Sequence, residues 1–176
     1  VGLKGTDGDC YRKALEMGAR PVTPFRTRDF LDNLKKTDVF HFYTASGKMG
    51  EDILKDQGLE YTVIGRVRGT TSAEDTKRII DLMLRERVDL IVFVGGDGTA
   101  RDVYDVLGLE IPVIGVPSGV KVFSSVFALS ARAAASMLER FLEGTALQEE
   151  EVLDIDEDAF RENVLSTRLY GYLKVP

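Results

Sequence analysis

The sequence predicts an α/β fold with a doubly wound, mostly parallel sheet. Short apolar runs alternate with segments of helical periodicity, and short loops separate them, which is typical of such folds. The run Leu90–Val94 is apolar at every position, as expected for a strand that helices cover on both faces. A glycine-rich segment, Gly95–Thr99 (GGDGT), joins this run to a helical segment. In parallel sheets, ligands bind beyond such strand ends.

The elements follow from these patterns in chain order. Strands are predicted where apolar or aromatic residues form short runs, and helices where apolar residues recur at helical spacing. The predicted strands are Val39–Tyr43, Tyr61–Ile64, Leu90–Val94, Pro112–Val116 and Val152–Ile155. The predicted helices are Gly8–Met17, Arg26–Lys36, Gly47–Gln57, Ser72–Glu86, Thr99–Leu107 and Ser124–Leu142.

Composition narrows the functional classes. Of the 176 residues, 44% are hydrophobic and 30% are charged, and the net charge is −6. Intrinsic disorder is disfavoured by this apolar content, and binding of nucleic acid is disfavoured by the negative charge. No apolar run reaches the roughly 18 residues that a bilayer span needs, and the chain start lacks the features of a signal peptide. We expect a cytoplasmic protein without membrane or nucleic-acid partners.

Cysteine and histidine are nearly absent. Cys10 is the single cysteine of the sequence, which excludes an intrachain disulfide and a cysteine-based metal cluster. His41, the single histidine, lies in an aromatic run that predicts a strand, and we favour a structural role for it over that of a catalytic base. Chemistry in this chain therefore depends on carboxylates, hydroxyls, lysine or a bound metal.

The segment Gly95–Thr99 is the strongest candidate site. Gly95, Gly96 and Gly98 leave backbone N–H groups uncovered, so a phosphate can approach closely, assisted by the N-terminus of the following helix. The alternative is a tight turn in which Asp97 and Thr99 cap the helix. The strand–GGDGT–helix context favours binding of a phosphate or nucleotide.

Simple electrostatics limits the role of Asp97. A helix N-terminus stabilises a carboxylate by about 0.3–1 kcal/mol, whereas a phosphate charge near 4 Å repels it by about 4 kcal/mol at an effective dielectric constant of 20. Either Mg²⁺ lies between Asp97 and the phosphates, or Asp97 faces a substrate hydroxyl and accepts its proton. The second arrangement is that of a kinase base.

Two other loops are expected at the same edge of the sheet. Thr71 and Glu74 have the spacing of a capping box at the start of a helix, and capping explains this loop as well as contact with a nucleotide does. The loop after Pro112–Val116 carries groups that can meet phosphates, and we favour a functional role for it. Its candidate residues are Ser118, Gly119 and Lys121. In the first loop, Asp75 is a candidate together with Thr71 and Glu74.

Two further segments carry candidate residues. The glycine-rich start, with Lys4, Thr6 and Asp7, is either another phosphate loop or a flexible end, and we favour ligand contact slightly. In the last predicted strand, Asp154 and Asp156 share one face and Glu157 lies on the other. Solvated charge is the simpler interpretation of this run unless the strand lines the cleft.

Several motifs together resemble one family. GGDGT is shared by NAD kinases, by diacylglycerol and sphingosine kinases and, in a looser form, by phosphofructokinases. The whole set is similar to the ATP-NAD kinase-like (AcoX-type) family within that superfamily. The motifs of this set are GLKGTDG at 2–8, MGED at 49–52, TSAEDT at 71–76, GGDGTARD at 95–102, PSGVK at 117–121 and DIDEDA at 154–159.

The resemblance implies a Rossmann-like amino-terminal domain of a kinase. The implied reaction transfers a phosphoryl group from ATP, with Mg²⁺ or another divalent cation, to the adenosine ribose 2′-hydroxyl of NAD, giving NADP. By resemblance, Gly95, Gly96, Gly98 and Thr99 hold phosphates, and Asp97 orients or deprotonates the hydroxyl. Asp156 and Glu157 occupy a place comparable to the Asn-Glu pair of NAD kinases but lack the asparagine.

The predicted organisation has two parts. Residues 1–148 form the nucleotide-binding α/β domain, and residues 149–176 begin a second domain or return as strands. We expect a longer protein that continues beyond both ends of this chain, acts on small-molecule nucleotides and forms a homo-oligomer. Two alternatives are a kinase for another small-molecule or lipid hydroxyl and a catalytically inactive, nucleotide-binding regulatory module.

Overall fold

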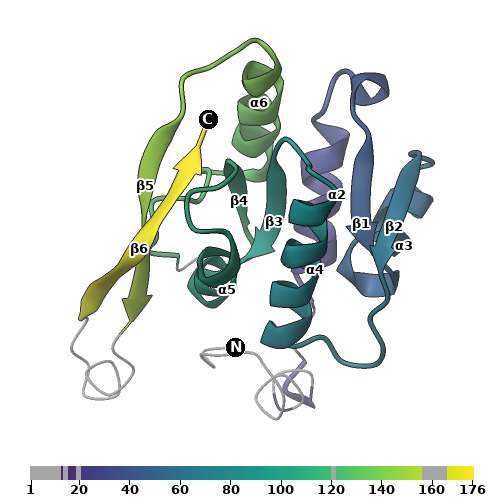
Figure 1. Cartoon of the computed structure of the whole chain (residues 1–176). Coiled ribbons are helices and arrows are strands. Elements are labelled where there is room, and N and C mark those ends of the chain that lie inside the picture. Colours follow the sequence, from purple (N-terminus) through teal and green to yellow (C-terminus); the bar gives the residue numbers. More distant parts are fainter. Residues whose placement is uncertain (1–12, 14–15, 19–20, 120–121, 156–165) are drawn as a thin grey trace.

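The computed structural model describes residues 13, 16–18, 21–119, 122–155 and 166–176, which form a mixed α/β arrangement (Figure 1). Strands and helices alternate up to the last helix, as predicted. The predicted helix Gly8–Met17 lies largely outside the described residues. The helices are α2 (Thr23–Asp32), α3 (Glu51–Asp56), α4 (Ala73–Arg85), α5 (Asp97–Leu107) and α6 (Ala131–Leu142), with short 3-10 helices at Thr37–Val39 and Gly47–Met49. The strands are β1 (Phe42–Ala45), β2 (Tyr61–Gly65), β3 (Ile91–Gly95), β4 (Val113–Pro117), β5 (Gln148–Ile155) and β6 (Thr167–Val175).

The strands form pairs. β1 pairs with β2 and β3 pairs with β4, both in parallel, whereas β5 and β6 are antiparallel. The fold is therefore mixed α/β with short parallel pairs, and one doubly wound, Rossmann-like sheet through all the strands stays a prediction. In Figure 1, the ends of β2 and β3 that lead into α4 and α5 lie on the same lower side of the molecule. The loops after these two strands thus share one side, the side where α/β folds bind ligands.

Apolar side chains cover both faces of the β3–β4 pair. On one face, Ile91 and Phe93 of β3 pack with buried residues of α4, α5, β5 and β6. On the other face, Ile114 and Val116 of β4 pack with buried residues of α2, α3 and α6. Alternate residues of a strand point to opposite faces, so a strand between two apolar layers needs apolar residues throughout. This explains the unbroken apolar run at Leu90–Val94.

Several predicted elements have different bounds, and for two of them the structure shows the reason. The first strand, expected at Val39–Tyr43, begins only at Phe42 because Thr37–Val39 forms a 3-10 helix that Phe40 N–H closes on the carbonyl of Thr37 at 3.3 Å. The helix expected at Ser124–Leu142 begins at Ala131, where the Ser130 hydroxyl caps it by accepting from Ala133 N–H at 3.1 Å.

The segment before α6 lies beside β4 instead of forming a helix. Gly115 N–H donates to the Val126 carbonyl at 3.3 Å, and Ala128 N–H donates to the Gly115 carbonyl at 2.8 Å. A side chain at Gly115 would meet the rings of Phe127 and Phe93 within 3.0 Å. Glycine thus permits the close approach that turns this apolar stretch into a neighbour of the sheet.

The antiparallel pair β5–β6 packs on the same core. Val152 of β5 and Leu173 of β6 are fully buried among residues of β3, β4 and α5. β5 and β6 therefore contact the α/β part, while the predicted organisation into residues 1–148 and 149–176 stays a prediction. Across the ranges that the structure describes, no helix combines the length and apolar character that crossing a bilayer requires.

Candidate functional site

The GGDGT segment lies at the junction of β3 and α5. Gly95 is the last residue of β3, Gly96 is the N-cap of α5 and Asp97 is its first residue. The carbonyl of Gly95 accepts a hydrogen bond from Ser118 N–H at 2.9 Å, so the loops after β3 and β4 are fastened together. The segment occupies the carboxyl end of a buried strand, where the sequence places it.

The protein itself holds the Asp97 carboxylate. Oδ1 accepts hydrogen bonds from Ser124 Oγ at 2.6 Å, Ser124 N–H at 2.9 Å and Phe123 N–H at 3.1 Å. Oδ2 shares the Phe123 N–H at 3.1 Å. Because a carboxylate offers about four lone-pair positions, Oδ1 is close to saturated, whereas Oδ2 keeps capacity for one more donor. Asp97 is half-buried, and its geometry leaves a further hydrogen bond possible at Oδ2.

The three glycines of the segment have different surroundings. A side chain at Gly96 would meet nothing within 4 Å, and at Gly98 the nearest atom is Arg101 Nη2 at 3.8 Å. At Gly95, in contrast, it would overlap the side chain of Thr99. The backbone at Gly96 and Gly98 is therefore open to a ligand, while Gly95 lets Thr99 fold back over the end of β3.

The loop before α4 is used for capping. Ser72 is the N-cap, and its hydroxyl accepts from Asp75 N–H at 3.3 Å while Asp75 Oδ2 accepts from Ser72 N–H at 3.2 Å. The capping box is thus Ser72 with Asp75, one residue beyond the predicted pair of Thr71 and Glu74, both of which are exposed. A hydrogen bond from the guanidinium of Arg78 lowers the pKa of Asp75 below its usual value.

The remaining candidate residues are distributed unevenly. Ser118 and Gly119 follow β4 beside the GGDGT segment, and Gly119 is exposed. The predicted phosphate contacts of all these groups stay predictions. Six candidates lie outside the described residues: Lys4, Thr6, Asp7, Lys121, Asp156 and Glu157.

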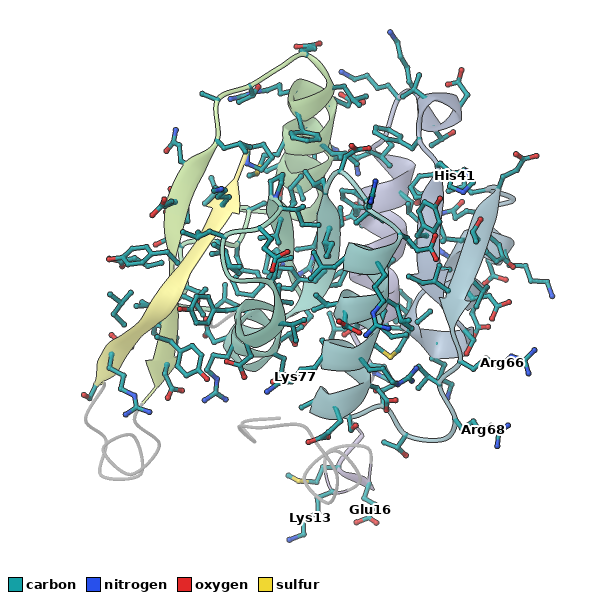
Figure 2. The ribbon with its side chains drawn as sticks, viewed as in Figure 1. Lys13, Glu16, His41, Arg66, Arg68 and Lys77 are labelled. Atoms are coloured by element: carbon teal, nitrogen blue, oxygen red, sulfur yellow. The ribbon has the colours of Figure 1, made fainter. Side chains whose placement is uncertain are left out.

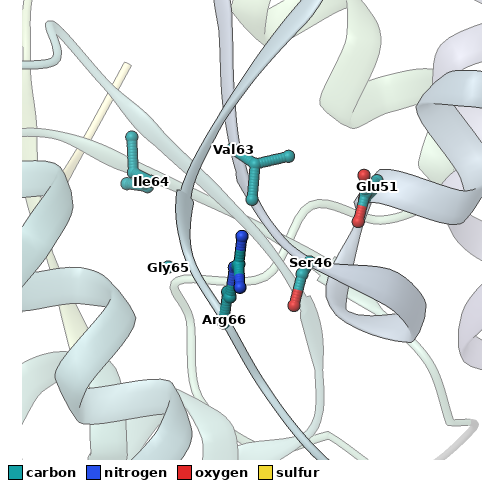
Figure 3. A pocket seen from close by; sticks show the side chains of 6 residues that line it. All are labelled: Ser46, Glu51, Val63, Ile64, Gly65 and Arg66. Carbon is teal, nitrogen blue, oxygen red and sulfur yellow. The ribbon is translucent and has the colours of Figure 1, made fainter.

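A pocket of about 420 Å³ opens beside the ends of β1 and β2 (Figure 3). Val63 and Ile64 point to opposite sides of β2, and the guanidinium of Arg66 lies between Val63 and Ser46. The Ser46 hydroxyl and the Glu51 carboxylate accept backbone N–H groups of the protein, at 2.8 Å each. An arginine in such a polar pocket can hold an anionic group.

Arg66 was not among the predicted site residues, although it stands directly after β2 and so at a strand end where ligands bind. Figure 2 shows Arg66 and Arg68 extending outward from the segment that follows β2. Ser124 was also missed, because the sequence places it inside a predicted helix, 27 residues from the Asp97 that it contacts. No local pattern in the sequence marks such a contact.

Ion pairs fasten α5 to its neighbours. Arg101 of α5 bonds Asp154 of β5 at 2.6 Å, and Arg168 of β6 bonds the other oxygen of the same carboxylate at 3.0 Å. Asp154, expected to be solvated, therefore joins α5 to both strands of the antiparallel pair, and only 13% of its side chain is exposed.

A second group of charges joins α4, α5 and β6. Lys77 bonds Asp105 at 2.5 Å, and the Tyr170 hydroxyl donates to the same carboxylate at 2.8 Å. The hydrogen bond from Lys77 lowers the pKa of Asp105 below its usual value. The same hydrogen bonds act in the opposite direction on the donors: they raise the pKa of Lys77 and of Tyr170 above their usual values.

The charged groups described above do not gather into a metal site. Among the residues that the structure describes, no group of three or more His, Cys, Asp or Glu side chains is arranged to hold a metal ion. Most of the Asp97 carboxylate is already bonded to Phe123 and Ser124. The described residues therefore do not form a protein cage for Mg²⁺, an ion that proteins often bind through few carboxylates together with substrate phosphates.

Comparison with known families identifies this arrangement. Searches of curated proteins and of solved structures gave no match. The family described as ATP-NAD kinase N-terminal domain matches residues 20–146, well over half of the chain. This range contains all of α2 to α6 and the GGDGT segment. The chain therefore belongs to the ATP-NAD kinase N-terminal domain family, which supports a kinase-like function.

Proposed function

We propose that the protein is a NAD kinase-like phosphotransferase, which transfers the γ-phosphoryl group of ATP to the adenosine ribose 2′-hydroxyl of NAD and releases NADP and ADP. Membership of the family supports the reaction class. The observation that carries the proposal is the Asp97 carboxylate, which is fixed at the carboxyl end of β3 with one oxygen available for a further donor.

The open backbone at Gly96 and Gly98 is proposed to receive phosphate groups. Both glycines lie at the N-terminus of α5, where N–H groups and the helix dipole favour negative charge. Asp97 in the same turn repels a nearby phosphate by about 4 kcal/mol, more than the helix N-terminus returns. The phosphates therefore bind to the glycine backbone, and the carboxylate faces the neutral hydroxyl of the acceptor.

In the proposed step, Asp97 Oδ2 accepts the proton of the 2′-hydroxyl as the ribose oxygen forms a bond to the γ-phosphorus. The bond from that phosphorus to the β–γ bridging oxygen breaks, and ADP leaves with the electron pair. The proton passes from Asp97 to solvent when the products leave. Divalent cation enters as part of the ATP substrate, where it neutralises phosphate charge. Such a general base contributes roughly 10²- to 10⁴-fold to the rate.

The pocket beside Arg66 is a proposed site for part of a second nucleotide. A NAD kinase has to hold two nucleotides at once, and the pocket supplies the guanidinium of Arg66 near strand ends on the same side as the GGDGT segment. We assign no donor or acceptor to it, since the two nucleotides share adenine, ribose and phosphate.

The experiment is ATP-dependent formation of NADP by the intact protein and by its Asp97→Asn variant. Asparagine keeps the shape of the side chain but is a poor base, so we expect kcat to fall at least about 100-fold while KM for NAD changes little. Asp89→Asn is the matched control, because Asp89 is exposed and lies before the opposite end of β3.

Three outcomes separate the candidate functions. Equal turnover by wild type and Asp97→Asn removes Asp97 from the mechanism. Phosphorylation of another small-molecule or lipid hydroxyl, with none of NAD, favours the first alternative. Nucleotide binding that survives Asp97→Asn, with no turnover of any acceptor in either protein, favours the inactive regulatory module.

A further inference from the structure

Ser124 has a contact pattern that capping or solvation does not explain. Only 4% of this residue is exposed, and its hydroxyl lies between two elements. Oγ donates to Asp97 Oδ1 at 2.6 Å and accepts from Leu153 N–H of β5 at 2.9 Å. One buried hydroxyl thus links the candidate catalytic carboxylate to the first strand of the antiparallel pair.

The direction of this chain of hydrogen bonds is fixed by its partners. A serine hydroxyl has one proton to donate, and the alternative acceptor, the carbonyl of Leu153, is 3.5 Å away. The shorter bond to the carboxylate is the charge-assisted and stronger one. The proton therefore goes to Asp97, and the hydroxyl oxygen remains free to accept from Leu153.

The neighbouring residue reinforces the link. Ser125 N–H donates to the carbonyl of Glu151 at 2.9 Å, so β5 is held at two nearby points by consecutive serines. The register of β5 against β6 shifts between Val152 and Leu153, next to the Leu153 N–H that donates to Ser124 Oγ. The irregularity of the strand coincides with its attachment to the site.

We propose that Ser124 is a positioning residue of the site: its hydroxyl holds Asp97 in the orientation that leaves Oδ2 for the substrate, and it makes that orientation depend on the position of β5. The kinetic part of this inference rests on the proposed function, whereas the link between Asp97 and β5 does not. Rotation of the carboxylate would break the bonds from both Ser124 and Phe123, so a displacement of β5 would act on the acceptor oxygen through Ser124.

The kinetic test compares three variants of the intact protein. Ser124→Ala removes the hydroxyl, and we expect kcat to fall roughly 10- to 100-fold with KM for NAD within about threefold of wild type. Ser124→Thr restores a hydroxyl and recovers most of the rate. Ser125→Ala is the matched control, because the side chain is exposed and its backbone makes the bond to β5; we expect wild-type kinetics from it.

A double-mutant cycle separates positioning from general loss of structure. In the Asp97→Asn background, Ser124→Ala should lower kcat by less than about a further twofold, because the carboxylate that Ser124 positions is already absent. An equal loss in both backgrounds would mean that Ser124 acts independently of Asp97, and would overturn the inference.

Amide hydrogen exchange tests the link without any assay of activity. Loss of the Ser124 hydroxyl leaves the Leu153 amide without its acceptor, so we expect exchange at Leu153 to be at least about tenfold faster in Ser124→Ala and unchanged in Ser125→Ala. Unchanged exchange at Leu153 in Ser124→Ala overturns the link even if the protein is an active kinase. If wild type forms no NADP but exchange behaves as expected, the proposed function fails and the link stands.

Discussion

At the scale of single residues, the glycines of GGDGT differ in ways that their shared identity in the sequence does not reveal. Gly96 has extended backbone angles that any residue adopts and empty space where a side chain would be, whereas a side chain at Gly95 would overlap Thr99. The space beside Gly96 is thus empty, as the proposed phosphate contact requires, whereas Gly95 is needed for internal packing.

This contrast gives a prediction about two substitutions. Gly96→Val should lower the affinity for ATP and NAD at least about tenfold by blocking the approach of phosphate, and it should change the free energy of unfolding by no more than about 1 kcal/mol, the scale of an N-cap substitution. Gly95→Ala should lower stability instead, because Thr99 has to move. Titration calorimetry and urea unfolding of both variants check this. Full nucleotide affinity in Gly96→Val would contradict the proposed binding of phosphate at the Gly96 backbone.

Asp97 shows what the sequence can and cannot supply at this scale. Its position after a buried strand and before a helix was predictable from the run Leu90–Val94 and the glycines that follow. Its partners were not, because Phe123 and Ser124 come from a distant segment, and helical periodicity placed Ser124 at the start of the last predicted helix. Contacts with β4 outweighed that periodicity.

At the scale of elements, the start of α4 shows how one residue of register matters. Thr71 and Glu74 have the spacing of a capping box, and so do Ser72 and Asp75 when aspartate takes the place of glutamate. The structure uses the second pair, and Arg78 completes it by bonding the Asp75 carboxylate at 3.1 Å. Spacing alone cannot choose between two overlapping pairs, whereas the helix that begins at Ala73 requires Ser72 as its N-cap.

The difference is measurable as a matched pair of variants. Ser72→Ala removes the side chain that accepts from Asp75 N–H, and we expect it to lower the free energy of unfolding by about 1 kcal/mol. Thr71→Ala changes an exposed residue outside the box and should stay within about 0.5 kcal/mol of wild type. Urea unfolding of both variants checks the assignment; a larger loss in Thr71→Ala than in Ser72→Ala would restore the predicted pair.

At the scale of the whole molecule, charged groups on α5 join parts of the chain that are remote in sequence. Lys77 of α4 and Tyr170 of β6 both bond Asp105 of α5. Arg101 of α5 bonds Asp154 of β5. The alternation of strands and helices and most element positions followed from apolar periodicity. The antiparallel pair and its ion pairs with α5 did not, because long-range pairing leaves no local signal.

The group at Asp105 predicts how stability depends on pH. The folded-state pKa of Asp105 lies below its usual value of 3.8, so its contribution is present above about that pH and is lost as the pH falls through the folded-state pKa. The folded-state pKa of Lys77 lies above 10.5, so its contribution is present below that pH and is lost as the pH rises through the folded-state pKa.

Asp105→Asn should therefore lower the Tm between these limits, and the difference from wild type should shrink in acid below pH 3.8 and in strong base. Asp81→Asn is the control, because Asp81 belongs to a more exposed pair with Arg85 on α4 alone, and we expect a smaller effect from it. Thermal melts across the pH range check this. A difference that is the same in acid and at neutral pH would exclude the ion pair as its cause.

We propose that Asp97 Oδ2 faces the hydroxyl that is phosphorylated, and a crystal structure of the intact protein with bound NAD shows whether it does. We expect the ribose 2′-hydroxyl within about 2.6–3.2 Å of Asp97 Oδ2, with Oδ1 still bonded to Ser124 and phosphate at the backbone of Gly96. NAD bound away from the carboxyl end of β3, or with a different hydroxyl at Asp97, would contradict it.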